Sequence, residues 1–373
     1  MRICILTQPL QTNYGGLLQT YALQTVLKKM GHDVWTEDRR YDKLSLLQRL
    51  KYKIKVVLGP IRHIYYPTSD DLNIISQNTK YFIRKYISTT EPIFTNDKSK
   101  LNKYSFDAYI VGSDQVWRPC FSPNIKDYFL DFTKNNSVKR IAYAASFGTD
   151  EWEFYPEQTT ECAELVNKFD AVSVREDSAV VMCKKFFGIT AEHLLDPTML
   201  LDKSDYQNIT YVENEDLHKE RLLTYILDIS SEKEHIIEYV AESLGVFPFS
   251  VMPPKRFFDA GRKDIKHCVY PRVTEWLRGF QDANFVVTDS FHGTAFSIIY
   301  NKPFISIANK DRGISRFTSL LKTFNLNDRL IFSYNRNDID RLINTPIDYG
   351  MVNKVIKSEQ EKAIEFLNNA LRS

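Results

Sequence analysis

One stretch in the second half of the chain combines a histidine with the start of a helix. Residues 285–287 are aromatic or β-branched, which is typical of a buried parallel strand. His292 and Gly293 follow in a turn, and Thr294 stands where a helix N-cap is expected, before the apolar run 295–299. The unpaired N–H groups of a helix start favour an anion, and an imidazole carries a proton near neutral pH. The pattern therefore predicts an anion site that holds a proton carrier.

The position of this stretch favours a substrate site. In an open α/β sheet, ligands bind beyond the carboxyl ends of the strands, which is where Asp289, Ser290 and His292 are expected. The alternative interpretation is that His292 is structural or solvated, as a lone histidine in a turn more often is.

Polar side chains also follow the strands that we expect in the first half of the chain. Strands are predicted at 107–111, 140–145, 171–174 and 192–195. Because parallel strands end at the same edge of a sheet, their polar tips should meet there. The tips supply Asp114, Gln115, Trp117, Arg175 and Asp196, which could orient a substrate or could be ordinary structural residues at strand ends.

The first strand of the chain, predicted at 2–7, leads through a loop into a helix. Asn13, Tyr14, Gly15 and Gly16 stand at the entrance of that helix. Paired glycines let backbone N–H groups approach a ligand closely, although the spacing is not that of a dinucleotide-binding loop. A glycine turn without a ligand is the alternative.

The strand tips pool two cations with the imidazole. Arg175 comes from the first half of the chain, and Lys310 or Arg312 follows the strand predicted at 304–307. Arginine binds a carboxylate or phosphate through two parallel hydrogen bonds, and lysine acts as a point charge. A small dianion is the implied ligand. Each cation also has an acid beside it in the sequence, so an ordinary ion pair is the competing interpretation.

Length and composition limit the classes of protein. A chain of 373 residues is long for one core, and its formal net charge of +2 gives no general attraction to nucleic acid. Its five cysteines include no C-x-x-C and are expected to be reduced, and no His/Cys spacing predicts a metal site. The N-terminus lacks the features of a signal peptide, and no apolar run is long enough to span a membrane. The expected location is the cytoplasm.

Two α/β series divide the chain. We expect an N-terminal Rossmann-like domain at 1–205 that binds the acceptor, a C-terminal one at 206–350 that binds the donor, and a final helix at 351–373 across the molecule. The second series has strands predicted at 222–227, 246–251, 268–270 and 304–307 besides the strand before His292. The polar stretch up to 103 is predicted to form helices and a connection.

Residues 39–63 form a basic insertion in the first half. They hold eight Lys or Arg against one acid, with aliphatic residues between them. Such a segment is typical of an amphipathic helix on an anionic membrane surface. It could equally be a solvated helix face that covers a hydrophobic stripe of the protein.

Six ordered blocks of the sequence carry a family resemblance. NYGGLLQTYALQTVLKKMGH, GSDQVW, YAASFG, SVRE, DPT and TDSFHGTAFSIIYNKPFI resemble the polysaccharide pyruvyl transferase family across essentially the whole chain. The resemblance implies a GT-B-like fold of two Rossmann-like domains facing a cleft. It also implies transfer from phosphoenolpyruvate to two hydroxyls of a sugar, which forms a cyclic pyruvate ketal and releases phosphate without a cofactor.

The resemblance also implies partners and residue roles. The acceptor would be a sugar of a cell-surface polysaccharide, such as a capsule or exopolysaccharide, or its lipid-linked oligosaccharide precursor at the inner membrane face. The family's arginine falls on Arg175, its histidine on His292, and its later basic residue on Lys310 or Arg312. Ser290, Gly293 and Thr294 join the donor side, and Asn13, Tyr14, Gly15, Gly16, Asp114, Gln115, Trp117 and Asp196 the acceptor side, with Trp117 stacking on the sugar.

One block departs from the family pattern. Many members have Arg-x-His where this chain has Ser290-Phe291-His292, so one phosphate-binding arginine is absent. Two expectations follow: either Lys310 or Arg312 substitutes for it, or the donor lies differently in this protein.

Two other functions remain open. A GT-B glycosyltransferase with a nucleotide-sugar donor shares the fold and would release a nucleoside diphosphate rather than phosphate. A non-catalytic carbohydrate or anion sensor would keep its biological activity after His292→Ala.

Overall fold

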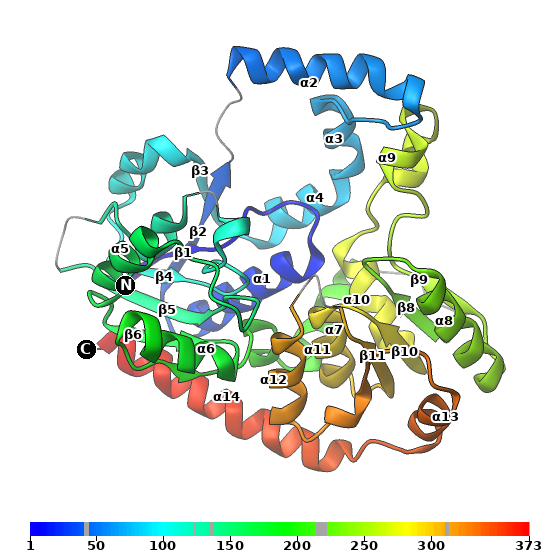
Figure 1. The fold of residues 1–373 in the computed structure, drawn as a ribbon. Helices are drawn as coiled ribbons and strands as arrows, with labels where there is room; N and C mark the ends of the chain where they lie inside the picture. The colour runs from blue at the N-terminus through cyan, green and yellow to red at the C-terminus, as the bar shows by residue number, and fades with distance from the viewer. Residues whose placement is uncertain (41–44, 123, 134–136, 214–221, 310–312, 373) are drawn as a thin grey trace.

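Two parallel β-sheets organise the molecule. The computed structural model describes residues 1–40, 45–122, 124–133, 137–213, 222–309 and 313–372. Seven strands between residues 2 and 193 form the first sheet, and five strands between residues 222 and 331 form the second. The two sheets lie in separate halves of the molecule that meet near α1, α7, α10 and α11 (Figure 1). The predicted α/β architecture with two Rossmann-like halves is confirmed.

All strand pairs within the two sheets are parallel. The first sheet has the order β3-β2-β1-β4-β5-β6-β7, and the second has the order β12-β11-β10-β8-β9. The strands are β1 (Arg2–Leu6), β2 (Asp33–Arg40), β3 (Thr89–Phe94), β4 (Ala108–Val111), β5 (Lys139–Ala145), β6 (Ala171–Val174), β7 (Glu192–His193), β8 (Leu222–Tyr225), β9 (Pro248–Ser250), β10 (Phe285–Thr288), β11 (Phe304–Ile307) and β12 (Leu330–Ile331).

Helices connect the strands and cover the sheets. The α-helices are α1 (Tyr14–Lys29), α2 (Leu46–Leu58), α3 (Ser69–Ile75), α4 (Gln77–Tyr86), α5 (Pro156–Val166), α6 (Asp177–Met182), α7 (Lys203–Val212), α8 (Ser231–Leu244), α9 (Phe257–Ala260), α10 (Val273–Asp282), α11 (Phe291–Ile299), α12 (Ser315–Thr323), α13 (Arg336–Asn344) and α14 (Tyr349–Arg372). Short helices include η1 (Gly59–Arg62), η2 (Thr95–Tyr104), η3 (Pro119–Phe121), η4 (Ile125–Phe129), η5 (Cys183–Phe187), η6 (Pro197–Leu200), η7 (Arg262–Cys268) and η9 (Asn327–Arg329).

The central strands are apolar because both faces of each sheet are covered. Every residue of β4, β10 and β11 is buried. Unbroken apolar runs are typical of parallel strands between two helix layers. This packing aligns the carboxyl ends of the strands, so that the residues after β4, β6, β7 and β10 gather between the two halves.

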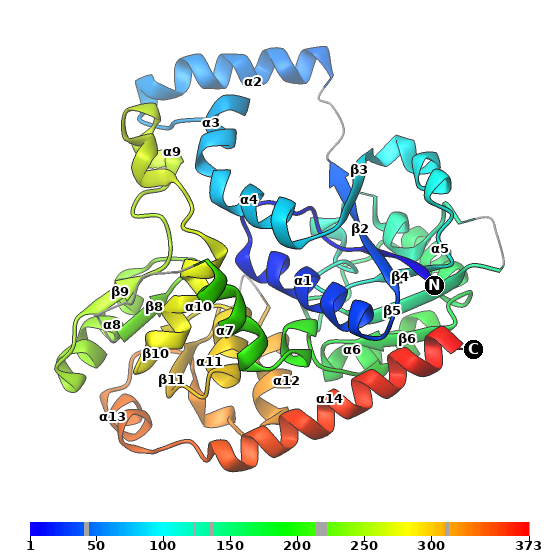
Figure 2. The ribbon, with the colours of Figure 1, turned by 180° about the vertical axis from the view of Figure 1, so that it is seen from behind.

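The last helix ties the two halves together. Near its start, Tyr349 Oη donates to the carbonyl of Ser297 in the second half at 3.5 Å. Further along, Gln360 Nε2 donates to the carbonyl of Met199 at 2.9 Å, and Phe366 packs against Tyr143 of the first sheet. The helix α14 therefore runs along one side of both halves (Figures 1 and 2).

One predicted strand is absent, and the stretch up to 103 contains a strand that was not predicted. The strand expected at 268–270 is replaced by the end of η7 and an irregular segment, because Cys268 packs with Ile75 and Phe257 rather than pairing in a sheet. The polar stretch predicted as helices and a connection contains β3, which pairs with β2 at the sheet edge. An edge position tolerates the missing N–H of Pro92.

The basic insertion is also different from the single helix that its pattern suggests. Arg39 and Arg40 belong to β2, and Arg39 is buried against Asp127, with Nη2 2.6 Å from the carboxylate. The amphipathic helix is the shorter α2, while residues 41–44 lie outside the described residues. Among the described residues, no helix is both long and apolar enough to cross a membrane.

Candidate functional site

A large cleft lies between the two halves. Its volume is about 1010 Å³, and both halves contribute to its walls. Asn13, Asp114 and Gln115 line the side of the first sheet. Ser290, Phe291, His292, Arg316 and Phe317 line the side of the second sheet. The loops after the parallel strands thus form the cleft, as the position of ligand sites in open α/β sheets predicts.

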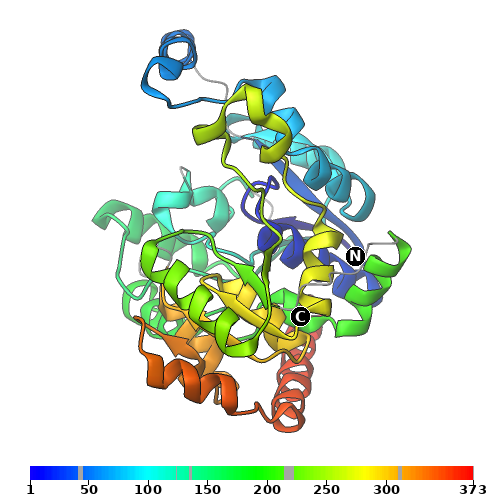
Figure 3. The ribbon, with the colours of Figure 1, turned by 90° about the vertical axis from the view of Figure 1, so that its right-hand side faces the viewer.

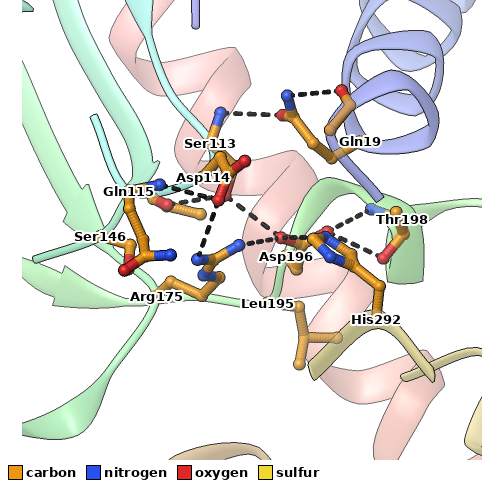
Figure 4. Close-up of polar contacts among 12 residues, drawn as sticks. Gln19, Ser113, Asp114, Gln115, Ser146, Arg175, Leu195, Asp196, Thr198 and His292 are labelled. Carbon is orange, nitrogen blue, oxygen red and sulfur yellow. Dashed lines mark hydrogen bonds and ion pairs between the residues drawn. The ribbon is translucent and has the colours of Figure 1, made fainter. Parts of the chain in front are cut away.

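Asp196 is the centre of a buried polar network beneath this cleft (Figure 4). Its Oδ1 accepts hydrogen bonds from the backbone N–H and the hydroxyl of Thr198, at 3.0 and 2.8 Å. Its Oδ2 accepts from Arg175 Nη1 at 2.8 Å and from the hydroxyl of Ser113 at 3.2 Å. Burial alone would raise the pKa of this carboxyl, but the imidazole of His292 and the guanidinium of Arg175 hold the pKa well below its usual range. Asp196 is therefore an ionised residue that positions its neighbours; it is buried and does not line the cleft, and its contact with a sugar stays a prediction.

Arg175 lies one layer below the cleft surface. Burial disfavours its charged form, yet the carboxylates of Asp196, Glu176 and Asp114 together raise its pKa above the ordinary value. Its guanidinium carbon lies 4.6 Å from the ring centre of Phe291. The Nε and Nη2 atoms form no hydrogen bond with any residue that the structure describes. Arg175 is therefore a cation held in place by its carboxylate neighbours, with two N–H groups, at Nε and Nη2, that form no hydrogen bond with a described residue.

His292 brings the second half of the molecule onto this network. Its Nε2 lies 3.7 Å from Asp196 Oδ2, and an ion pair forms there when the ring is protonated. On the other side, the ring packs against Gly15, where an added Cβ would stand 2.0 Å from Nδ1. Gly15 is thus required by the close approach of the histidine. The imidazole is held between an aspartate and the backbone of α1, both from the first half.

Two helix N-termini converge at His292. Helix α1 begins at Tyr14, and its first intrahelical hydrogen bond runs from Leu17 N–H to the carbonyl of Asn13. Helix α11 begins at Phe291 with Ser290 as its N-cap, and the hydroxyl of Ser290 accepts from Gly293 N–H at 3.4 Å. Both ends present N–H groups that lack an acceptor within the helix, so the site favours an anion.

The helix start differs by one turn from the sequence prediction. Thr294 is not the N-cap, because α11 already begins at Phe291 and the hydroxyl of Thr294 bonds the carbonyl of Ser290 and the hydroxyl of Ser306. Gly293 and Thr294 are buried and do not line the cleft. Of the predicted helix-start residues, Ser290 and His292 reach it.

Arg316 is a cation that the sequence analysis missed. It lies in the first turn of α12, lines the cleft, and its guanidinium carbon is 5.7 Å from the ring centre of Phe291. Burial, and then the charge of Arg175, lower its pKa to about 10, so that it stays charged at neutral pH. The signal in the sequence was an arginine in the first turn of a helix at the carboxyl edge of the sheet. The cations considered instead, Lys310 and Arg312, lie outside the described residues.

Several predicted acceptor residues have structural roles. Trp117 has no exposed surface, its indole N–H donates to the carbonyl of Tyr128 at 3.0 Å, and its ring stacks on Phe129. These contacts agree with the alternative interpretation of Trp117 as a structural residue at a strand end. Tyr14 lines the cleft, but its hydroxyl donates to the carbonyl of Pro271 at 2.9 Å and its ring stacks on Trp276, so that it joins the two halves.

Asp289 and Gly16 also have structural surroundings. Asp289 borders the cleft but is buried, and it accepts hydrogen bonds from the N–H groups of Leu227 and Asp228. Gly16 lies beside the side chain of Asn13: a Cβ added at Gly16 would stand 3.2 Å from Asn13 Nδ2. In the described part of the chain, no three His, Cys, Asp or Glu side chains are grouped to hold a metal ion.

Comparison with solved structures identifies the architecture. A UDP-GlcNAc 2-epimerase from Neisseria meningitidis is 11% identical, with a TM-score of 0.52 over 98% of this chain and 99% of the other. UGT89C1 of Arabidopsis thaliana, solved with UDP-L-rhamnose, is 8% identical, with a TM-score of 0.50 over 98% of both chains. The glycotransferase of kitacinnamycin is 13% identical, with a TM-score of 0.50 over 99% and 97%. At such low identity the likeness shows the fold alone, which is GT-B-like as predicted.

Comparison with sequence families goes further. No curated protein matches the chain. The profile of one family, described as polysaccharide pyruvyl transferase, matches residues 13–311. The matched range runs from the N-cap of α1 to beyond β11 and contains Arg175, Asp196 and His292. The chain belongs to the polysaccharide pyruvyl transferase family.

Proposed function

We propose that the cleft binds phosphoenolpyruvate and transfers its three-carbon unit to two hydroxyls of a sugar, forming a cyclic pyruvate ketal. One observation carries the proposal: the ring of Phe291 contacts the imidazole of His292 and the guanidinium groups of two buried arginines, Arg175 and Arg316. Phosphoenolpyruvate is a small trianion that needs cations at both ends and a proton at C3. The family membership supports a pyruvyl transferase, and the cleft supplies groups that suit this donor.

The reaction balances without a cofactor. Protonation of C3 converts this carbon into a methyl group, makes the C2–C3 bond single, and leaves C2 electrophilic. One sugar hydroxyl attacks C2, phosphate leaves with the electron pair of its C–O bond, and the second hydroxyl closes the ketal. Of the two hydroxyl protons, one ends on the methyl carbon and the other on phosphate. The enzyme must therefore move protons, which a histidine near neutral pH does well.

His292 is the proton carrier in this proposal. Protonated His292 can give its proton to C3 and can then, as a neutral base, receive one from the attacking hydroxyl. The ionised carboxylate of Asp196, 3.7 Å from Nε2, stabilises the ring while it is positively charged. Gly15 fixes the ring from the other side.

The two anionic ends of the donor have separate partners. Arg316 lines the cleft, and a guanidinium can bind a carboxylate or a phosphate through two parallel hydrogen bonds. The N-terminus of α11 offers backbone N–H groups beside it. Arg175 contributes positive charge from below the cleft surface, 4.6 Å from the ring centre of Phe291. Because the charge of Arg175 lowers the pKa of Arg316, an anion bound between them would relieve their repulsion. Arg316 thus takes the place of the arginine missing before His292.

The acceptor fits the opposite wall. Asn13, Asp114 and Gln115 present polar side chains there, and aromatic residues lie further out at Phe121, Phe258 and Tyr270. Sugars bind through such combinations of polar groups and ring faces. We propose a sugar of a cell-surface polysaccharide, or of its lipid-linked precursor, as acceptor.

A donor assay tests the reaction class. The protein is incubated with candidate oligosaccharide acceptors and either phosphoenolpyruvate or nucleotide sugars, and the released anion and product mass are measured. Phosphate release, together with a product heavier by pyruvate minus water, supports the proposal. Release of a nucleoside diphosphate with transfer of a sugar would instead establish a glycosyltransferase.

A further inference from the structure

Helix α2 stands apart from both sheets. It contacts η1 and the segment of Tyr66 and Pro67, and it projects beyond the rest of the chain (Figures 1 and 3). Its N-cap Ser45 and Gln48 form a capping box, so the helix begins at a defined residue. No residue of α2 is buried.

The inner side of the helix is aromatic and aliphatic. Tyr52 and Val56 are its only partly buried residues. The hydroxyl of Tyr52 donates to the carbonyl of Pro67 at 2.8 Å, and its ring packs edge-on against Tyr66. These contacts fix which side of α2 faces the protein.

The opposite side is apolar and faces solvent. At about 100° per residue, its apolar positions span an arc of roughly 120° opposite Tyr52 and Val56. Their exposed fractions lie between 48% and 84%, and they are Leu46, Leu47, Leu50, Ile54, Val57 and Leu58. The alternative interpretation was that the polar face of the helix is solvated while its apolar stripe is buried against the protein. The structure excludes it, because the apolar stripe itself is exposed to solvent. Ile61 in η1 extends this surface with an exposed fraction of 75%.

Basic residues border the apolar face on both sides. On the helical projection, Lys51 and Lys55 follow one edge, and Arg49 and Lys53 follow the other. Arg62 lies just beyond the helix, and no acid occurs between residues 45 and 63. Long basic side chains at the edge of an apolar stripe let the stripe enter a lipid surface while their charges reach the headgroups.

The charge distribution decides between possible occupants. A second copy of this chain would bring the same cations to the apolar face, and no acid of the segment would neutralise them. A neutral apolar partner would cover the apolar face but would supply no acidic groups to pair with these cations. An anionic bilayer satisfies both features at once, because it takes the aliphatic side chains and attracts the flanking charges. We propose that the α2 surface, residues 45–62, docks the protein on an anionic membrane.

The position of the α2 surface relative to the cleft gives docking a consequence. Tyr65 N–H donates to the carbonyl of Phe258 at 2.9 Å, and Tyr66 packs on the ring of Phe258 at 4.9 Å. Phe258 and Pro67 both line the cleft. The docking surface is thus continuous with one rim of the cleft, and a membrane-bound protein would hold that rim near the bilayer.

Vesicle binding tests the proposal without donor or acceptor, so its outcome is independent of the proposed reaction. Wild-type protein is sedimented with vesicles of phosphatidylcholine containing phosphatidylglycerol, and with vesicles of phosphatidylcholine alone. We expect binding to the anionic vesicles that falls as salt rises. The Lys51→Glu/Lys53→Glu/Lys55→Glu variant should bind at least about 100-fold more weakly, since each basic residue near the surface contributes roughly a fivefold factor.

Two further variants separate docking from simple charge attraction. Lys184→Glu/Lys354→Glu/Lys357→Glu changes three exposed lysines on η5 and α14 and should bind like the wild type. Leu50→Ser/Ile54→Ser/Val57→Ser keeps every charge of α2 and should still lose most of the binding. Gel filtration confirms that each variant remains folded and reports any dimer of the wild type. Failure of the wild type to bind anionic vesicles, equal loss in the two lysine variants, or a dimer abolished by the serine variant would overturn the proposal.

Discussion

Two buried aspartates at the carboxyl ends of strands have opposite surroundings. Asp289 follows β10 and accepts from two backbone N–H groups, from Asn309, and from Lys233 Nζ at 2.6 Å. All of these partners belong to the second half of the chain. Asp196 follows β7 and binds groups from three loops of the first half, and His292 of the second half lies above it. The first aspartate joins the loops after β8 and β11 to α8 within the second half, whereas the second lies where the two halves meet.

The difference between the two sets of partners supports the proposed role of Asp196 beside His292. Both carboxylates are buried and both follow a strand, so neither burial nor position separates them. The partners do: Asp289 is saturated by backbone groups and one lysine, while Asp196 holds a cation and faces an imidazole whose Nε2 forms no hydrogen bond with a described residue. A site for chemistry keeps a reactive atom unsatisfied for the substrate.

Removing the imidazole should have the largest effect. His292→Ala is expected to lower turnover by about 10²–10⁴-fold, the usual contribution of a proton-transferring residue, with a smaller change in donor affinity. Steady-state phosphate release and calorimetric titration with phosphoenolpyruvate measure the two quantities. Near-normal turnover in a folded mutant would remove His292 from the chemistry.

Matched asparagine variants of the two aspartates should differ in which property they change, kcat or the free energy of unfolding. Asp196→Asn weakens the hold on Arg175 and His292 and should lower kcat by at least about tenfold. Asp289→Asn breaks a buried ion pair and should lower the free energy of unfolding by about 3 kcal/mol while kcat per folded molecule changes little. Denaturant unfolding and activity assays on both variants check this. Equal kcat losses in the two would erase the distinction.

Arg316, which we propose replaces the arginine absent before His292, gives a sharper test of the donor side. Arg316→Gln should raise KM for phosphoenolpyruvate by roughly 10–100-fold, because a charge-assisted pair of hydrogen bonds is lost. Arg256 also lines the cleft, but it is exposed and paired with Asp259 at 2.8 Å. Arg256→Gln is therefore the control and should leave KM nearly unchanged. The reverse ranking would place the donor at the outer rim.

Neighbouring glycines provide a steric test. An alanine at Gly15 would collide with the ring of His292, whereas an alanine at Gly16 would meet only the side chain of Asn13 at 3.2 Å. We expect Gly15→Ala to lower kcat severalfold by moving the imidazole and Gly16→Ala to have a weaker effect. Kinetics of both variants at saturating donor decide the matter, and a larger loss in Gly16→Ala contradicts the described ring position.

The smallest effect concerns acid stability. The folded-state pKa of Asp196 lies below its unfolded value, so this carboxylate stabilises the fold above about pH 4 and loses that contribution as the pH falls toward the folded pKa. The stability difference between wild type and Asp196→Asn should be full at neutral pH and should shrink in acid. Unfolding curves across that range measure it, and a difference that grows on acidification would have the wrong sign.

The sequence predicted the fold better than the partners of each side chain. Mainly apolar runs such as 285–287 and 304–307 identify parallel strands because burial on both faces leaves a local pattern. His292, Asp114 and Gln115 were found because polar residues after such strands lie at one edge of the sheet. For Trp117 the sequence left a structural and a sugar-stacking role open, because a buried and a stacking tryptophan look alike in sequence. Arg316 was missed because it comes nine residues beyond the end of a strand, and only tertiary packing brings it onto Phe291.

A structure of the protein with bound phosphoenolpyruvate tests the central claim most directly. Our account predicts that one anionic end lies against Arg316 and the N-terminus of α11, beside Phe291, with C3 toward the imidazole of His292. A donor bound away from both Arg316 and His292, for example among Lys255 and Arg256 at the outer rim, would contradict it.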